Sequence, residues 1–128
     1  MDIREQIRGG QHIGLPTADM DRTMAFYRRL GFEPVYETIN EGNRVAFLRQ
    51  GDVTVETYEM DGAAGKPGAI DHVALDVTDV DRLFDQLSQE GFRPLEGAVQ
   101  FLPFWERGVR FFTILGPNGE KVEFSQML

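Results

Sequence analysis

Apolar residues recur at helical spacing in two stretches of the chain. The apolar stripe of the first stretch consists of Met20, Met24, Tyr27 and Leu30. That of the second consists of Val80, Leu83, Phe84 and Leu87. An aspartate precedes each stripe and a glycine follows it, as is typical of the two ends of a helix. The pattern therefore predicts two amphipathic helices, over residues 19–30 and 79–90.

Short β-like runs surround each predicted helix. One precedes each helix, at residues 11–15 and 71–76. Three follow each helix, at 35–39, 44–49 and 53–59 in the first half and near 93–98, at 109–115 and at 121–127 in the second. The turn Gly116-Pro117-Asn118-Gly119 contains an Asn-Gly pair, which favours a hairpin between the last two runs. Each half thus predicts the order strand, helix and three strands.

The two halves are also related in sequence. Residues 11–36 align without a gap on residues 71–96, and eight of these 26 positions are identical. The identical pairs are His12/His72, Leu15/Leu75, Asp19/Asp79, Asp21/Asp81, Arg22/Arg82, Gly31/Gly91, Phe32/Phe92 and Pro34/Pro94. The chain therefore contains two copies of one module, over about 10–60 and 70–128, joined by a linker at 61–69.

Length and composition describe one folded domain. The chain has 128 residues, of which 41% are hydrophobic and 27% charged, and modules of roughly 60 residues are marginal alone. We therefore expect both modules to share one core in a single domain, 1–128. A net charge of −8 argues against a nucleic-acid partner. No apolar run is long enough to span a bilayer, so we expect no membrane partner and a cytoplasmic location.

Histidine and glutamate recur at matching places in the two modules. His12 and His72, the two histidines of the chain, lie in the first strand of each module, and Glu56 and Glu123 lie in the last. A hydrogen-bonded structural role for the histidines, or a salt bridge from the glutamates to Arg44 or Arg110, is the plainer interpretation. The repeated positions, however, favour four ligands that converge on one divalent metal, such as zinc, nickel, cobalt, manganese or iron.

Two further groups are candidates for substrate binding. Arg44 and Arg110 are possible clamps for an anionic group, on residue type alone. Phe104 and Trp105 belong to an aromatic stretch of the second module where the first has only a tight turn. These rings could line a ligand pocket, act as a lid, pack against a partner chain or fill the core.

Together, these motifs resemble the vicinal oxygen chelate superfamily, which includes glyoxalase I, fosfomycin-resistance proteins, extradiol dioxygenases and methylmalonyl-CoA epimerase. The resemblance rests on HIGL…DMDRTMAFYRRLGF, its echo DHVAL…DVDRL…GFRP, and the ending GPNGEKVEF. It implies an α+β fold of tandem βαβββ modules, with curved, barrel-like mixed sheets, helices outside and usually a homodimer. It also implies that His12, Glu56, His72 and Glu123 bind the metal, with zinc or nickel favoured.

The resemblance implies a glyoxalase-like lyase or isomerase, of the lactoylglutathione lyase kind. Such an enzyme moves a proton through an enediolate, with Glu123 or Glu56 as the base, on a small substrate with vicinal oxygens such as an adduct of a 2-oxoaldehyde and a thiol. The thiol could be glutathione, although Asp71 stands where glyoxalase I commonly has glycine. The Gly-Pro pair at 116–117 disfavours the epimerase branch, which has His-Pro there.

Three other activities remain open within the same superfamily. An extradiol-type dioxygenase or a fosfomycin-type thiol transferase would generally use two histidines and one glutamate, so that a fourth ligand at Glu56 favours proton transfer instead. A non-catalytic protein that binds a drug would need no metal ligands, and the two His–Glu pairs argue against it.

Overall fold

The computed structural model describes residues 2–29, 31–115 and 121–128. Within these ranges the chain forms three helices and eight strands, which confirms the predicted α+β class. The chain divides into two compact units. The first-repeat unit comprises residues 12–71, and the second-repeat unit comprises the residues up to 11 and those from 72 onward.

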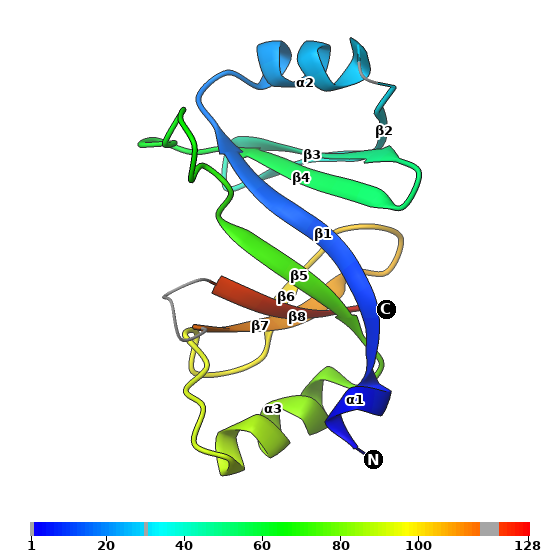
Figure 1. The fold of residues 1–128 in the computed structure, drawn as a ribbon, viewed down its shortest axis with the longest axis vertical. Coiled ribbons are helices and arrows are strands. Elements are labelled where there is room, and N and C mark those ends of the chain that lie inside the picture. The colour runs from blue at the N-terminus through cyan, green and yellow to red at the C-terminus, as the bar shows by residue number, and fades with distance from the viewer. Residues whose placement is uncertain (1, 30, 116–120) are drawn as a thin grey trace. The chain divides into compact units, whose positions relative to one another are not determined.

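The first-repeat unit is a mixed four-stranded sheet with one helix, α2 (Met20–Arg29). Its strands are β1 (Ile7–Thr17), of which residues 12–17 belong to this unit, β2 (Glu33–Asn40), β3 (Asn43–Gln50) and β4 (Val53–Glu59). Their order is β2-β3-β4-β1, with β1 parallel to β4 and the other neighbours antiparallel. Figure 1 shows α2 along one side of this sheet.

Side-chain alternation gives this sheet a face that packs against α2 and a face that does not. Ala46 and Leu48 of β3 form a buried cluster with Met20 and Met24 of α2. Phe47, which lies between them in the sequence, points to the opposite face because successive strand residues alternate. The predicted stripe of α2 is thereby confirmed at Met20 and Met24, whereas Leu30 lies outside the described residues.

The second-repeat unit repeats this plan. It contains α3 (Val80–Gln89) and the strands β5 (His72–Val77), β6 (Gln100–Leu102), β7 (Val109–Leu115) and β8 (Lys121–Met127). Their order is β5-β8-β7-β6, with β5 parallel to β8 and the other neighbours antiparallel. Both units therefore have the predicted order of strand, helix and three strands, although the turn at 116–119 lies outside the described residues.

The core of the second-repeat unit lies between α3 and one face of its sheet. Its buried members are Val77, Val80, Leu83, Leu87, Phe112, Ile114 and Phe124. A short helix that the pattern did not predict, α1 (Ile3–Gln6), adds Ile3 to this core, and the start of β1 adds Ile7. Asp2 and Glu5 form a capping box at the start of α1, a signal that was present in the sequence.

The predicted strand near residues 93–98 is wrong. The chain makes turns there, and the first strand after α3 is β6, only three residues long. Pro94 has no N–H to donate to a ladder, and Gly97 adopts a φ of 78°. The side chain of Glu96 accepts a hydrogen bond from the Thr113 N–H at 2.8 Å, so a carboxylate replaces the backbone carbonyl that a strand would supply.

No helix in the described ranges is long and apolar enough to cross a membrane.

The fold predicts a strong dependence of stability on Leu83, which is fully buried between α3 and its sheet. Replacing Leu83 with alanine should lower the free energy of unfolding by about 2–5 kcal/mol, because the change leaves a cavity. Leu95→Ala removes the same atoms from a half-exposed side chain and should cost less than about 1 kcal/mol. Urea titration followed by circular dichroism measures both, and equal losses would contradict this core.

Candidate metal centre

His12 and Glu56 face each other in the first-repeat unit. The parallel register of β1 and β4 sets Gly14 beside Glu56, and His12 lies two residues before Gly14, on the same face. Nε2 of His12 is 3.2 Å from Oε1 of Glu56, and the two side chains are only 5% and 12% exposed. The first-repeat unit thus holds an imidazole and a carboxylate together in a largely buried place.

His72 and Glu123 form the corresponding pair of the second-repeat unit. The register of β5 and β8 sets Ala74 beside Glu123, and His72 lies two residues before Ala74. Nε2 of His72 is 3.7 Å from Oε1 of Glu123, with side chains 10% and 14% exposed. The repeat therefore holds at the level of strand register, and Glu56 is the structural counterpart of Glu123.

The neighbours of the two pairs differ. Phe47 lies opposite Glu56 in the β3–β4 register, and its ring meets that of His12 edge to face at 5.4 Å between centroids. In the second-repeat unit the same register position, opposite Glu123, is occupied by Thr113. The first pair is thus packed by an aromatic ring and the second lies beside a buried hydroxyl.

The donor atoms of each pair fit a divalent cation. Two ligand atoms that each lie about 2.1 Å from one ion, at angles of 90–110°, are roughly 3.0–3.4 Å apart. The separation of 3.2 Å in the first pair falls in this range, and that of 3.7 Å in the second is slightly wider. Imidazole nitrogen with carboxylate oxygen suits zinc, nickel, cobalt, manganese or iron. The same distances also suit an ion pair if the imidazole is protonated.

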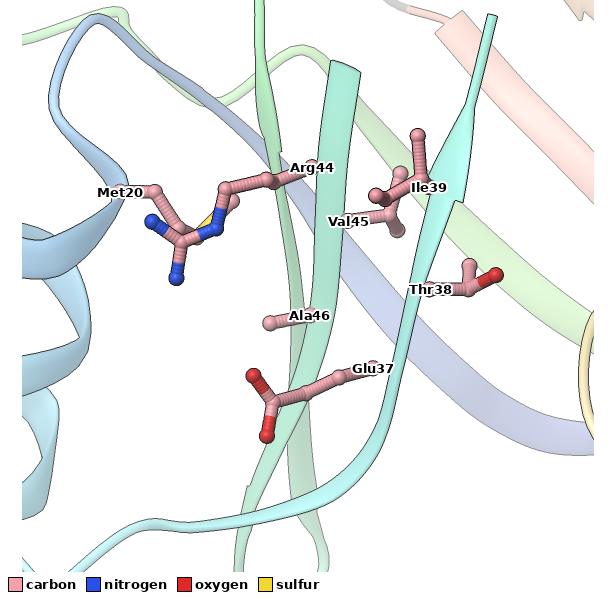
Figure 2. A pocket seen from close by; sticks show the side chains of 7 residues that line it. All are labelled: Met20, Glu37, Thr38, Ile39, Arg44, Val45 and Ala46. Atoms are coloured by element: carbon pink, nitrogen blue, oxygen red, sulfur yellow. The ribbon is translucent and has the colours of Figure 1, made fainter. Parts of the chain in front are cut away.

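The structure does not bring Arg44 to the His12–Glu56 pair. Arg44 belongs to the face of the sheet that packs against α2, where its Nη1 donates a hydrogen bond to Asp21 at 2.8 Å. Figure 2 shows Arg44 pointing to the same side as Ala46 and Glu37, beside Met20 of α2, in a pocket of about 280 Å³. The hydrogen bond with the Asp21 carboxylate raises the pKa of Arg44.

Arg110 occupies the corresponding position in the second-repeat unit. Its guanidinium binds both carboxylate oxygens of Asp81, with Nη2 and Oδ1 2.8 Å apart. Arg110 lies two residues before Phe112 of the core on β7 and therefore faces α3 rather than Glu123. Asp21 and Asp81 are identical positions of the repeat, so each unit joins the start of its helix to its sheet by one Asp–Arg pair.

Phe104 and Trp105 lie in the segment between β6 and β7. Phe104 is 4% exposed, and Trp105 is half-buried with a φ of 63°. A bulky residue in the left-handed region costs of order 1–3 kcal/mol and persists only where its surroundings impose it. Contact of either ring with a substrate stays a prediction.

Arg49 is a residue of the His12–Glu56 face that the sequence analysis missed. It pairs with Thr54 in the β3–β4 register, and its Nε donates a hydrogen bond to Thr54 Oγ1 at 3.0 Å. Thr54 lies two residues before Glu56 and so shares its face. Pairing residues outward from the turn at 51–52 sets Gln50 opposite Val53 and Arg49 opposite Thr54, which would have placed Arg49 on this face.

Solved structures with the same fold include an epimerase, a glyoxalase and a dioxygenase. Methylmalonyl-CoA epimerase from Mycobacterium tuberculosis has a TM-score of 0.80 and 24% identity, over 100% of this chain and 93% of that one. The Mn(II)-bound glyoxalase from Novosphingobium aromaticivorans has a TM-score of 0.66 and 23% identity, over 94% and 39%. A halotolerant catechol dioxygenase has a TM-score of 0.63 and 19% identity, over 93% and 40%. At these identities the similarity concerns the fold.

A comparison with curated protein sequences gives no match. A family model, in contrast, covers nearly the whole chain: the model described as Glyoxalase/Bleomycin resistance protein/Dioxygenase superfamily matches residues 10–124. This range covers the first predicted module, most of the second and both His–Glu pairs. The chain therefore belongs to the glyoxalase/bleomycin resistance protein/dioxygenase superfamily.

Proposed function

We propose that the protein is a metal-dependent, glyoxalase-like lyase or isomerase. Its substrate would be a small molecule with two adjacent oxygens, such as the adduct of a 2-oxoaldehyde and a thiol, and its reaction the transfer of a proton between neighbouring carbons. The observation that carries this proposal is the His–Glu pair at the same register position of both units.

The proposal assigns His12, Glu56, His72 and Glu123 as the ligands of one divalent ion. Each unit contributes one imidazole and one carboxylate. For this donor set we expect zinc or nickel first, and cobalt, manganese or iron next. Such an ion, when bound, polarises the oxygens of the substrate and so acidifies the neighbouring C–H. Two glutamates would balance its charge.

Within this site we assign the role of general base to Glu123. Its Oε1 lies further from its histidine than that of Glu56 does, at 3.7 Å against 3.2 Å, and we base the assignment on this wider separation. A carboxylate that takes a proton from one carbon and returns it to the next must be able to move between them. Glu56, fixed beside His12 and Phe47, would instead remain a ligand.

Burial of the pairs supports proton transfer at carbon. The side chains of both pairs are at most 14% exposed, and water is therefore limited as a competing proton donor. Removal of water also strengthens each electrostatic interaction of the site. The edge of the Phe47 ring restrains His12, which would hold the imidazole in place throughout the reaction.

The finer assignments follow the same proposal. We propose that glutathione is one thiol that the substrate contains, that the protein acts as a homodimer in the cytoplasm, and that both units form one domain. Size-exclusion chromatography with light scattering tests the dimer. A single calorimetric unfolding transition would support one domain, and two separate transitions would contradict it.

Metal content provides the first test of this function. The purified protein, loaded with zinc or nickel and dialysed, should retain about one ion per chain, whereas His12→Ala and Glu123→Ala should lose most of it. Elemental analysis measures the content. Glu37→Ala is the matched control, because Glu37 lies on the α2 side of its sheet. Retention of the ion by all variants would refute the site.

Turnover provides the second test. The loaded protein should isomerise adducts of methylglyoxal with at least one thiol, and Glu123→Gln should lower kcat at least about a hundredfold, since it removes the base. Glu56→Gln should chiefly weaken metal retention. Absorbance at the wavelength of the thioester follows the reaction. Oxygen consumption, or transfer of a thiol to an epoxide, would identify the rival dioxygenase or transferase instead.

A further inference from the structure

The first-repeat unit has a pocket on the side of its sheet that faces α2. The pocket has a volume of about 280 Å³ and is lined by Met20 of α2, residues 37–39 of β2 and residues 44–46 of β3. The helix packs against β3, whereas β2 forms the edge of the sheet. The pocket is therefore the hollow between the helix and the edge strand (Figure 2).

The second-repeat unit fills the corresponding place with an aromatic ring. Ala46 precedes the residue opposite Glu56, and Phe112 precedes the residue opposite Glu123, so the two positions are equivalent in the repeat. Phe112 is fully buried in the core of its unit, whereas Ala46 ends at a methyl group. The pocket thus exists where the first-repeat unit lacks a ring that the second has.

Glu37 adds a carboxylate to the wall of this pocket. It lies opposite Ala46 in the β2–β3 register, and Figure 2 shows it on the same side as Ala46 and Arg44. Extension of the β6–β7 register by one residue sets Val99 opposite Phe112, and Val99 packs against the core. Glu37 is exposed and makes no hydrogen bond or ion pair within the part of the chain that the structure describes. A ligand can therefore bind this carboxylate without displacing a partner.

The charges around the pocket favour a cation. The hydrogen bond with Asp21 raises the pKa of Arg44, and the charges of Asp21, Glu59 and Glu37 raise it further. Three carboxylates therefore act on one guanidinium, which leaves an excess of negative charge. Arg44 is bonded to Asp21, and its main-chain N–H donates to Glu59, so that Glu37 is the carboxylate left for a ligand.

We propose that this pocket binds a small organic ammonium ion with an aromatic body. The ammonium group donates hydrogen bonds to Glu37, and the ring lies against Met20, Ala46 and Ile39. Methionine is a favourable neighbour of an aromatic ring. Because pockets for drug-sized ligands measure roughly 300–1,000 Å³, this one suits a single ring with a short chain. The site lies on the opposite face of the sheet from the proposed metal ligands and does not rest on the proposed function.

A matched pair of probes tests the inference. The ions of 2-phenylethylamine and the neutral 2-phenylethanol share one ring and one chain, and differ in a charged or uncharged terminal group. NMR titration of the nitrogen-15-labelled protein, with EDTA to exclude metal coordination, should give a dissociation constant on the order of 1 mM for the ammonium ion. The alcohol should bind about threefold more weakly, as expected for the loss of one exposed ion pair.

The location of binding is part of the same test. The amide shifts should gather at residues 37–39 and 44–46 and at the start of α2. Shifts that gather instead around His12 and His72, or equal affinities of the two probes, would overturn the inference. Because metal is excluded from the titration, the outcome is independent of whether the proposed metal-dependent function holds.

Variants of β2 test the carboxylate. Glu37→Gln should abolish the preference for the ammonium ion and leave the affinity for the alcohol within about twofold. Glu33→Gln makes the same change of charge on the same strand, outside the pocket, and should retain the preference. A preference that survives Glu37→Gln, or that Glu33→Gln removes equally, would contradict the assignment.

Two further variants test the hollow itself. Ala46→Leu should weaken binding of both probes at least about fivefold, because the larger side chain occupies the space of the ring. Circular dichroism establishes that this variant is folded. If it is not, Ile39→Lys replaces it, since Ile39 is 67% exposed; its added positive charge should weaken the ammonium ion alone. Undiminished binding of the ammonium ion to the folded variant would overturn the site.

Discussion

The burial of two carboxylates is the main physical constraint on this structure. Removing an ionised carboxylate from water costs several kcal/mol unless a partner compensates for it. Glu56 and Glu123 both meet this cost beside a histidine, on the face of a sheet that its helix does not cover. The same arrangement occurs twice, at the same register position. A bound cation would compensate the charge of each carboxylate, which is why the pairs are the natural place to look for chemistry.

One face of each sheet packs against a helix and the other holds a His–Glu pair. This difference explains what the sequence could predict. Helical spacing located the residues that cover one face, and Met20, Met24, Val80, Leu83 and Leu87 are all buried there. The internal repeat then pointed to the residues of the other face, since a titratable side chain that recurs within an apolar run is seldom needed for packing. Periodicity and repetition were therefore sufficient for the modules and for both His–Glu pairs.

The same reasoning could not predict where long side chains point or how irregular segments fold. Residue type alone cannot tell on which face an arginine lies, and Arg44 and Arg110 are instead joined to aspartates of their helices. The segment at 93–98 takes the place of a strand in the repeated order of elements, but its Pro and Gly residues and the acceptor side chain of Glu96 make it a series of turns. In both places the structure is decided by a contact between residues that are far apart in the sequence.

The first residues of the chain pack in the unit that holds the second copy of the module, although the rest of that unit begins only at residue 72. Residues up to 11 belong to the second-repeat unit, where Ile3 and Ile7 join its core and Arg8 pairs with Asp76. β1 then continues into the first-repeat unit. Cleavage at the linker would therefore leave the carboxy-terminal fragment without a piece of its own interior. The second-repeat unit is therefore assembled from two separate stretches of the sequence, and neither stretch holds all of its core.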